Sequence, residues 1–185
     1  LKDLTDMGGA EAMGAALAQL ALAAGLPART LALAGTLAWQ GFLTREGAVA
    51  CPLEAALAPE GRRGTALLVS YRSFVAAADL APVTALHAAL EASGFRVASV
   101  FVPSPKAPEA RGWLAGWAKR LAPTIVVDTT AFSIVGEDGA TPYDGTGAPV
   151  LKVAFAGSDR ATWESSTRGL SPAVLAMHVV LPEVD

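Results

Sequence analysis

Four short apolar runs rich in β-branched residues follow one another from residue 64 onward, and they constrain the fold more than any other feature of the sequence. They cover residues 66–71, 97–102, 124–129 and 150–156. Each run has the length of one strand and few polar residues, which is typical of strands buried on both faces of a sheet. Helical stripes separate the first three runs. This alternation favours parallel strands with right-handed crossovers, so we expect an α/β fold with an open, doubly wound, mainly parallel sheet.

Two helices are predicted between these strands. The first begins at Pro82 and ends at Gly94, and the second lies between Pro108 and Pro123. Their apolar residues recur at helical spacing: Val83, Leu86 and Leu90 in the first helix, and Ala110, Trp113, Trp117 and Leu121 in the second. We expect both stripes to face the sheet. His87 lies on the stripe side of its helix, where a packed histidine is commoner than a catalytic one.

The N-terminal third has a different pattern. Residues 9–24 carry Met13, Leu17 and Leu20 at helical spacing. We therefore expect an amphipathic helix, an N-terminal extension of the sheet domain, whose apolar stripe belongs to the core.

Glycines and prolines interrupt residues 31–63, where the apolar runs predict a strand near residues 37–43 and a short helix near residues 53–57. We divide the chain accordingly into an N-terminal helix with a connecting segment, residues 1–63, and an α/β domain, residues 64–185.

The C-terminal part combines a loop with two short helices. Residues 136–149 hold four glycines and two prolines, and we expect them to form a loop at the carboxyl edge of the sheet, where such folds place their ligands. Residues 158–166 and 171–178 are predicted to be helical.

Composition excludes several classes of function. The formal net charge is -3, so the chain lacks the basic field that binds nucleic acid. Cys51 is the only cysteine, which excludes an internal disulfide and a cysteine zinc cluster and fits a reducing cytoplasm, where we expect the protein to be located. The apolar run at residues 15–24 is shorter than the roughly 20 residues needed to span a bilayer, so no membrane span is expected. Because the chain starts at Leu1 without a methionine, we expect a piece of a longer protein.

The standard nucleotide and hydrolase motifs are absent from the sequence. It has no G-x-G-x-x-G after a strand, no Walker lysine loop and no G-x-S-x-G elbow. If ATP drives the function, another chain hydrolyses it.

Several polar and aromatic residues are candidates for a binding site. Tyr71 and Arg72 end the first predicted strand, at the edge where ligand-facing residues collect. Arg72 either binds a carboxylate of a ligand or pairs with Asp79. Trp163 and Arg168 flank a polar turn, and an aromatic ring beside a cation suits a flat tetrapyrrole; a tryptophan packed in the core is the alternative.

His178 and Glu183 lie five residues apart near the end of the chain. Imidazole and carboxylate are suitable ligands for cobalt or zinc, and suitable bases for removing pyrrole protons. By spacing alone, a helix-end histidine and a solvated carboxylate explain the same residues.

Eight short motifs give the chain a specific resemblance. In order they are Tyr71-Arg72-Ser73, Ala81-Pro82-Val83 with Ala85-Leu86, Thr129-Thr130-Ala131-Phe132, Asp144-Gly145, Pro149-Val150-Leu151, Trp163-Glu164-Ser165, Arg168-Gly169-Leu170-Ser171-Pro172 and Leu181-Pro182-Glu183-Val184-Asp185. With these motifs the chain resembles the large subunit of aerobic cobaltochelatase, a relative of the magnesium chelatase H subunit. The resemblance covers residues 64–185 well and the first third loosely.

The resemblance implies a much longer subunit that binds a corrin, hydrogenobyrinic acid a,c-diamide, and the substrate metal Co2+. Separate AAA-type ATPase subunits supply ATP hydrolysis, so we expect this chain to be inactive alone. Glu183 is similar to the family glutamate that lines the chelation cavity, which implies a proton acceptor or a metal-guiding carboxylate.

Three residues depart from the family pattern: Asp128 and His178 replace asparagine, and Lys152 replaces glutamine. We predict that Asp128 and Lys152, on neighbouring strands, form a charged pair. The departures also suit a paralogue that inserts another metal into another tetrapyrrole. A non-catalytic α/β domain that docks a ligand or a partner is the alternative from another class, because fold does not determine function.

Overall fold

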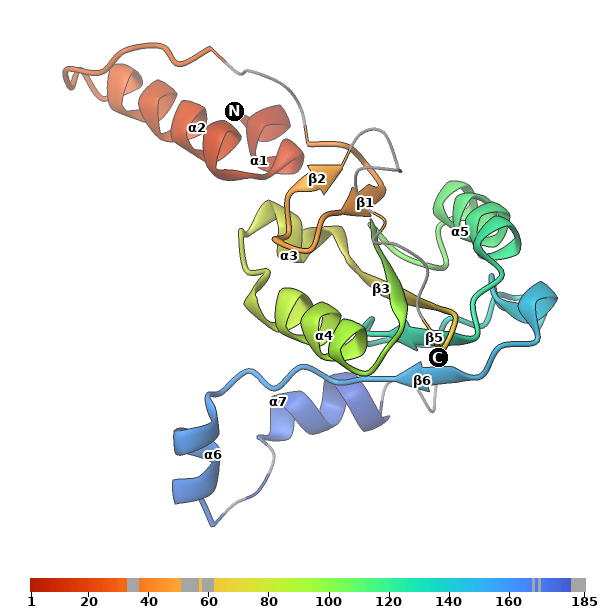
Figure 1. Ribbon diagram of the computed structural model, residues 1–185. Helices are drawn as coiled ribbons and strands as arrows, with labels where there is room; N and C mark the ends of the chain where they lie inside the picture. Colours follow the sequence, from red (N-terminus) through yellow and green to blue (C-terminus); the bar gives the residue numbers. More distant parts are fainter. Residues whose placement is uncertain (33–36, 51–56, 58–61, 168, 170, 181–185) are drawn as a thin grey trace.

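A six-stranded sheet forms the centre of the computed structural model, which describes residues 1–32, 37–50, 57, 62–167, 169 and 171–180 (Figure 1). The strand order is β2-β1-β4-β3-β5-β6. Four strands are mutually parallel, as predicted: β3 (Thr65–Tyr71), β4 (Arg96–Val102), β5 (Ile125–Asp128) and β6 (Val150–Lys152). The expected open α/β sheet is therefore confirmed.

The crossovers reverse direction at β3. Helix α4 (Ala81–Ala92) connects β3 to β4, and helix α5 (Pro108–Leu121) connects β4 to β5. Because β4 and β5 lie on opposite sides of β3, the carboxyl ends of β3 and β5 form a topological switch point. The short helix α3 (Arg72–Ala76) begins directly at the end of β3.

Two hydrophobic cores lie on opposite faces of the sheet. Leu67 and Val69 of β3 pack with α5, whereas Leu68 packs with α4. Successive side chains of a strand point to opposite faces, so a strand covered by helices on both sides is apolar at every position. This explains the continuous apolar runs of the sequence.

The helices are where the sequence predicts them, and the predicted stripe of α5 packs against the core, with Leu114 and Ala118 buried beside it. The fully buried residues of α5 are Ala110, Leu114 and Ala118. Trp113 and Trp117 instead pack at the border of the core against Phe42, with ring centroids 5.4 and 4.9 Å from the Phe42 ring. The small residues let α5 approach the sheet closely, and the two large rings cover the side of the added strand that carries Phe42.

In α4, Val83 is fully buried, Leu86 and Leu90 are partly buried, and His87 is buried with them. The Nδ1 atom of His87 lies 2.8 Å from Ser99 Oγ, and its Nε2 atom lies 3.4 Å from Glu91 Oε1. His87 is therefore a packed residue with polar partners, as expected.

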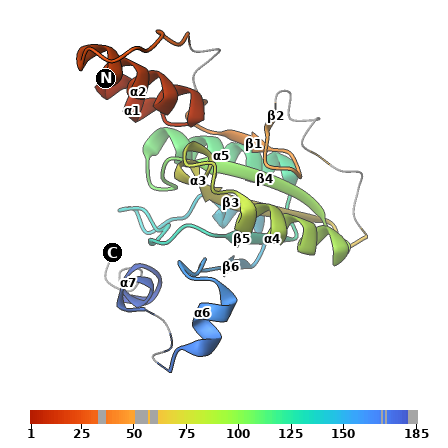
Figure 2. The same cartoon turned by 90° about the vertical axis from the view of Figure 1, so that its left-hand side faces the viewer.

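The described residues of the N-terminal segment form two helices and two strands. Helices α1 (Lys2–Met7) and α2 (Ala10–Ala23) lie at one end of the molecule, and the sheet separates them from the C-terminal helices (Figure 2). Strand β1 (Gly41–Leu43) pairs antiparallel with β4, and β2 (Val49–Ala50) pairs antiparallel with β1. The strand expected near residues 37–43 is thus present but shorter. The helix expected near residues 53–57 falls almost entirely outside the described residues.

The prediction for the buried face of α2 is wrong. Met13, Leu17 and Leu20 are 44, 63 and 50% exposed, and the buried side consists of Ala12, Ala15 and Ala16. Helix α2 packs against α1 and projects beyond the sheet, so its large apolar side chains have no core to fill (Figure 1).

The fourth parallel strand is not buried, in contrast to the prediction. Val150 and Leu151 of β6 are 37 and 51% exposed. Strand β6 is the last strand of the sheet, and residues 129–149, which connect it to β5, contain the 3-10 turn η2 (Asp144–Thr146) instead of a crossover helix. Its faces consequently lack the helical cover that β3 and β4 have.

Two short helices follow β6. They are α6 (Arg160–Ser165) and α7 (Pro172–Leu175), and α7 continues into the wider helical turn η3 (Ala176–Val180). Both predicted C-terminal helices are therefore present. Across the described residues, we find no helix with the length and apolar character that crossing a membrane requires.

Candidate functional site

A cleft of about 280 Å³ opens at the topological switch point. Its lining includes Tyr71 at the end of β3, Thr129 and Ala131 after β5, Phe74 of α3, Phe155 after β6 and Met177 of η3. Open α/β sheets bind their ligands at this position, because the loops separate where the crossovers change direction. We call this hollow the switch-point cleft.

The walls of the switch-point cleft are mainly apolar. The rings of Phe74 and Phe155 meet edge to face, with centroids 5.6 Å apart and planes at 76°. Asp79 and the Tyr71 hydroxyl supply polar groups at the border. A cleft with aromatic walls and few polar groups suits a flat, largely apolar group.

A buried carboxylate lies directly behind the cleft. Asp128, the last residue of β5, has no exposed surface. Its Oδ1 atom accepts hydrogen bonds from Thr130 N at 2.8 Å and Thr130 Oγ1 at 2.6 Å, and its Oδ2 atom accepts one from the Tyr143 hydroxyl at 3.1 Å. These bonds join the end of β5 to the glycine-rich loop before β6.

Lys152 of β6 pairs with Asp128, as predicted. The distance from Lys152 Nζ to Asp128 Oδ1 is 3.3 Å. The same ammonium donates to Thr130 O at 2.9 Å, Thr130 Oγ1 at 3.0 Å and Phe132 O at 2.9 Å. A buried carboxylate is tolerated when it is both hydrogen-bonded and paired with a cation, and Asp128 meets both conditions.

Two tyrosines beside this pair have raised pKa values. Burial raises the pKa of Tyr143 well above its usual value, and the nearby Asp128 carboxylate raises this pKa further. Burial also raises the pKa of Tyr71, with a smaller contribution from Asp128. The Tyr71 hydroxyl accepts a hydrogen bond from Phe132 N at 3.4 Å, which links the cleft wall to the loop after β5.

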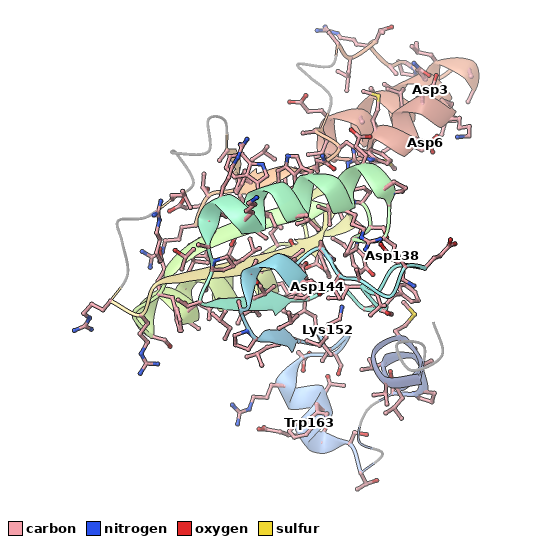
Figure 3. The ribbon with its side chains drawn as sticks, turned by 90° about the vertical axis from the view of Figure 1, so that its right-hand side faces the viewer. Asp3, Asp6, Asp138, Asp144, Lys152 and Trp163 are labelled. Atoms are coloured by element: carbon pink, nitrogen blue, oxygen red, sulfur yellow. The ribbon has the colours of Figure 1, made fainter. Side chains whose placement is uncertain are left out.

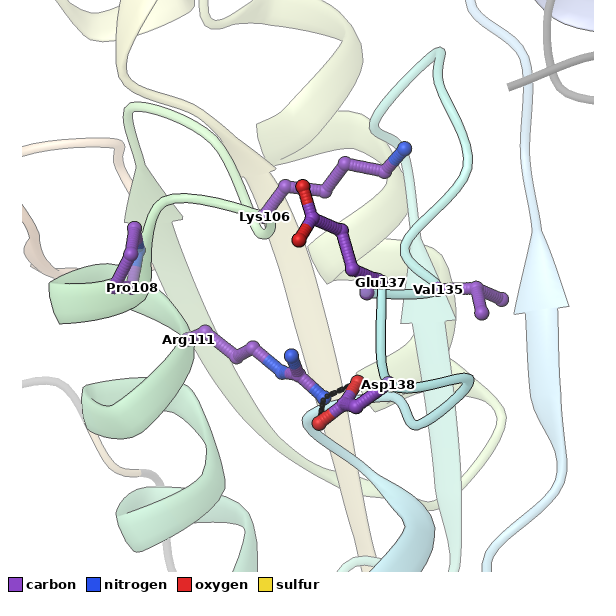
Figure 4. Close-up of a pocket in the computed structure, with 7 residues that line it drawn as sticks. Lys106, Pro108, Arg111, Val135, Glu137 and Asp138 are labelled. Carbon is purple, nitrogen blue, oxygen red and sulfur yellow. Dashed lines mark hydrogen bonds and ion pairs between the residues drawn. The ribbon is translucent and has the colours of Figure 1, made fainter.

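A second hollow, of about 790 Å³, lies beyond the carboxyl ends of β4 and β5 (Figure 4). Lys106, Arg111, Glu137 and Asp138 line it, and Figure 4 shows the Arg111 side chain reaching Asp138. Arg111 Nη2 donates to both carboxylate oxygens of Asp138, at 2.8 and 3.0 Å, and this guanidinium lowers the pKa of Asp138. We call this hollow the charged groove.

Comparison of the chain with models of known protein families identifies its relatives. The family model for CobN/Magnesium Chelatase matches residues 7–185. The chain belongs to this family. This match confirms the family that the sequence motifs indicate.

Two CobN proteins are similar to the chain over part of their length. The aerobic cobaltochelatase subunit CobN of Sinorhizobium sp is 46% identical over 119 residues, which is 62% of this chain and 9% of that protein. The subunit of the same name from Pseudomonas aeruginosa is 31% identical over 127 residues, which is 68% of this chain and 10% of that protein. The chain thus spans about a tenth of the length of these relatives.

A solved cobaltochelatase structure shares the fold. The catalytic subunit of cobaltochelatase from Mycobacterium tuberculosis matches 98% of this chain with a TM-score of 0.63 and 22% sequence identity. The match covers 15% of that subunit. Almost the whole CobN-like fold described here is therefore found within a much longer subunit.

Of the residues that the sequence predicts for the site of this CobN family member, Tyr71 lines the switch-point cleft. The backbone of His178 lies in η3, directly after the cleft residue Met177. Arg168 and Glu183 lie outside the described residues.

Arg72 points away from the cleft. Its guanidinium donates to the backbone oxygens of Met7 at 2.5 Å, Ala38 at 3.0 Å and Leu37 at 3.2 Å. It also lies over the ring of Trp39, 5.3 Å from the centroid. In this arrangement Arg72 joins the N-terminal segment to the end of β3.

Trp163 lies on α6, outside the sheet, and is 50% exposed (Figure 3). The alternative of a core tryptophan is therefore wrong. An exposed ring remains free to meet a flat ligand or another part of a larger protein.

Sequence reasoning missed Phe74, Phe155 and Tyr143 as residues of the site. Phe74 lies three residues after Tyr71, and Phe155 lies within the fourth apolar run, so a signal existed for both. Tyr143 lies in a glycine-rich loop and is only 2% exposed, which no periodicity indicates. Within the part of the chain that the structure describes, no three His, Cys, Asp or Glu side chains are grouped to hold a metal ion.

Proposed function

We propose that the chain is a segment of a cobaltochelatase large subunit and forms part of the wall that holds the corrin during cobalt insertion. The observation that carries this proposal is the aromatic cleft at the switch point, in a chain that belongs to the CobN/magnesium chelatase family. Hydrogenobyrinic acid a,c-diamide is the proposed ligand, and Co2+ is the substrate metal.

The size of the cleft limits what it holds. Pockets that enclose a drug-sized ligand measure roughly 300–1,000 Å³. The switch-point cleft, at about 280 Å³, is smaller than that and suits one edge of a tetrapyrrole. Other parts of the subunit supply the remaining walls in this proposal, which agrees with the small share of the CobN relatives that the chain covers.

The insertion chemistry needs a base. Two pyrrole protons leave when a divalent metal enters the ring, and a carboxylate both accepts a proton and attracts the incoming cation. We propose Glu183 for this role, with His178 as a second metal ligand. The position of Met177, a cleft residue next to His178, supports a location for this segment near the ligand.

Each binding residue predicted from the sequence has its own proposed role. Tyr71 lines the cleft and is proposed to contact the corrin directly. Trp163, on α6, and Arg168 are proposed to meet the ring. Arg72 is proposed to support this wall indirectly, by joining the N-terminal segment to the end of β3 next to Tyr71.

The chain is proposed to act only within a complex. It has no phosphate-binding loop, so AAA-type ATPase subunits are proposed to hydrolyse ATP in the cytoplasm while the large subunit holds the ring. By itself the chain is proposed to have no insertion activity.

The test replaces Glu183 in the full-length subunit, assembled with its ATPase partners. Glu183→Gln keeps the shape of the side chain and removes the base, so the cobalt insertion rate is expected to fall about 10²- to 10⁴-fold. Corrin affinity, measured by fluorescence quenching, is expected to stay within about twofold, because the amide keeps the size and polarity of the carboxyl group. Glu137→Gln in the charged groove is the matched control and is expected to insert cobalt at the normal rate.

Two outcomes would reject parts of this proposal. A normal insertion rate for Glu183→Gln would exclude Glu183 as the base. Wild-type subunit that binds no corrin would reject the function itself and favour a domain that docks partner proteins.

A further inference from the structure

The loop after β5 forms one wall of the switch-point cleft. Thr129 and Ala131 line the cleft, and Phe132 N donates to the Tyr71 hydroxyl on the opposite side. Thr129 is tied to β3, because its N and Oγ1 atoms both donate to Val69 O at 2.9 Å. From Thr130 to Phe132 the backbone has no helix or strand pairing, so specific side-chain contacts must hold its shape.

Lys152 supplies those contacts from the neighbouring strand. Its register partner in β5 is Asp128, so its side chain starts at the carboxyl edge of the sheet. The ammonium has three protons and four oxygen atoms within reach, two of them the carbonyl oxygens of Thr130 and Phe132. Two carbonyl groups of an otherwise irregular loop are thereby directed to one cation.

Asp128 holds the same loop residue from the other side. Thr130 donates its backbone N–H and its hydroxyl to the carboxylate, while Lys152 Nζ donates to the Thr130 hydroxyl oxygen and carbonyl oxygen. Thr130 is thus fixed between a buried anion and its paired cation, one residue from the cleft lining at Thr129 and Ala131.

We propose that Lys152 is a positioning residue for the switch-point cleft: its ammonium holds the loop at residues 130–132 so that Thr129, Ala131 and Tyr71 keep the shape that a tetrapyrrole edge requires. This inference rests on the proposed function. Lys152 does not line the cleft and acts through the loop.

The experiment separates positioning from stability with paired substitutions in the full-length subunit. Lys152→Met leaves the Asp128 carboxylate buried without its cation, so this variant loses stability as well as loop contacts. The double variant Asp128→Asn with Lys152→Met removes both charges, and its melting temperature is expected to return close to the wild-type value. Its corrin dissociation constant is still expected to rise about tenfold, because the two loop carbonyls remain without a donor.

A second double variant tests rescue. Asp128→Asn with Lys152→Gln restores an N–H donor near the loop carbonyls without a charge, so the dissociation constant is expected to return to within about threefold of the wild-type value. Lys106→Met, in the charged groove, is the control and is expected to leave corrin affinity unchanged.

Amide hydrogen exchange gives a readout that needs no ligand. In Asp128→Asn with Lys152→Met, the amides of Thr130 and Phe132 are expected to exchange at least about tenfold faster than in the wild type, while those of β3 and β4 stay protected. Faster exchange with unchanged corrin affinity would overturn the positioning role and leave the proposed function intact. Unchanged exchange would show that Lys152 does not hold the loop, and a wild type without corrin affinity would reject the proposed function alone.

Discussion

The switch-point cleft and the charged groove differ in how their charges are satisfied. In the groove, Arg111 and Asp138 meet each other at the surface, with 25 and 61% of their side chains exposed. In the cleft, the charged pair of Asp128 and Lys152 lies behind the wall, and the lining itself is aromatic and apolar. The larger hollow therefore presents an ion pair that water already solvates, whereas the smaller one presents apolar surface that a ligand can cover.

In our proposal the smaller hollow, and not the larger one, therefore binds the ligand. A solvated ion pair contributes little free energy, and its two groups already satisfy each other. Apolar walls held in place by a buried polar network lose unfavourable contact with water when a ligand binds. Matched substitutions in the two hollows test whether they differ in this way.

The largest expected difference is in stability. Lys152→Met is expected to lower the free energy of unfolding by about 3 kcal/mol, because it leaves a buried carboxylate unpaired; partial exposure of Lys152 keeps the loss at the low end of the range for buried pairs. Arg111→Met is expected to cost about 0–1 kcal/mol, because its pair is exposed. Urea unfolding of the two variants measures both values. Equal losses would show that the two pairs are equivalent.

The next difference is in corrin affinity. Phe155→Ala removes one of the two rings that meet in the cleft, and the corrin dissociation constant of the full-length subunit is expected to rise about tenfold. Val135→Ala, at the border of the charged groove, is expected to change it less than about twofold. Titration followed by fluorescence quenching gives both constants. The reverse order would move the binding site to the charged groove.

The smallest difference is in pH dependence. The folded pKa of Tyr143 is raised, so its contribution to stability is fully present below about pH 10 and is lost as the pH rises from there toward the folded value. The folded pKa of Asp138 is lowered, so its contribution is present above about pH 4 and is lost as the pH falls through the folded value. Tyr143→Phe is expected to weaken the alkaline dependence, and Arg111→Gln the acid one. Melting temperatures measured from pH 3 to 11 would contradict this if Tyr143→Phe left the alkaline limb unchanged or Arg111→Gln left the acid limb unchanged.

The strands and helices of the domain could be predicted from local patterns, because alternation of buried runs and helical stripes depends on near neighbours in the chain. The parallel arrangement followed from the same alternation, and the pairing of Asp128 with Lys152 followed from adjacent strands. The position of Tyr71 at the carboxyl edge of the sheet was also predictable, since it ends β3. These inferences need only secondary structure and the handedness of crossovers.

Local patterns and motifs in the sequence were therefore enough to predict the α/β class, the order of its elements, the family and the charged pair. The buried face of α2, the exposure of β6 and the contacts of Arg72 with backbone carbonyls of the N-terminal segment depended on tertiary packing. Tertiary packing also decided that Phe74, Phe155 and Met177 meet in one cleft. The physical reason is the same in each case: burial and contact depend on which surfaces other elements cover, and residues far apart in the chain decide that.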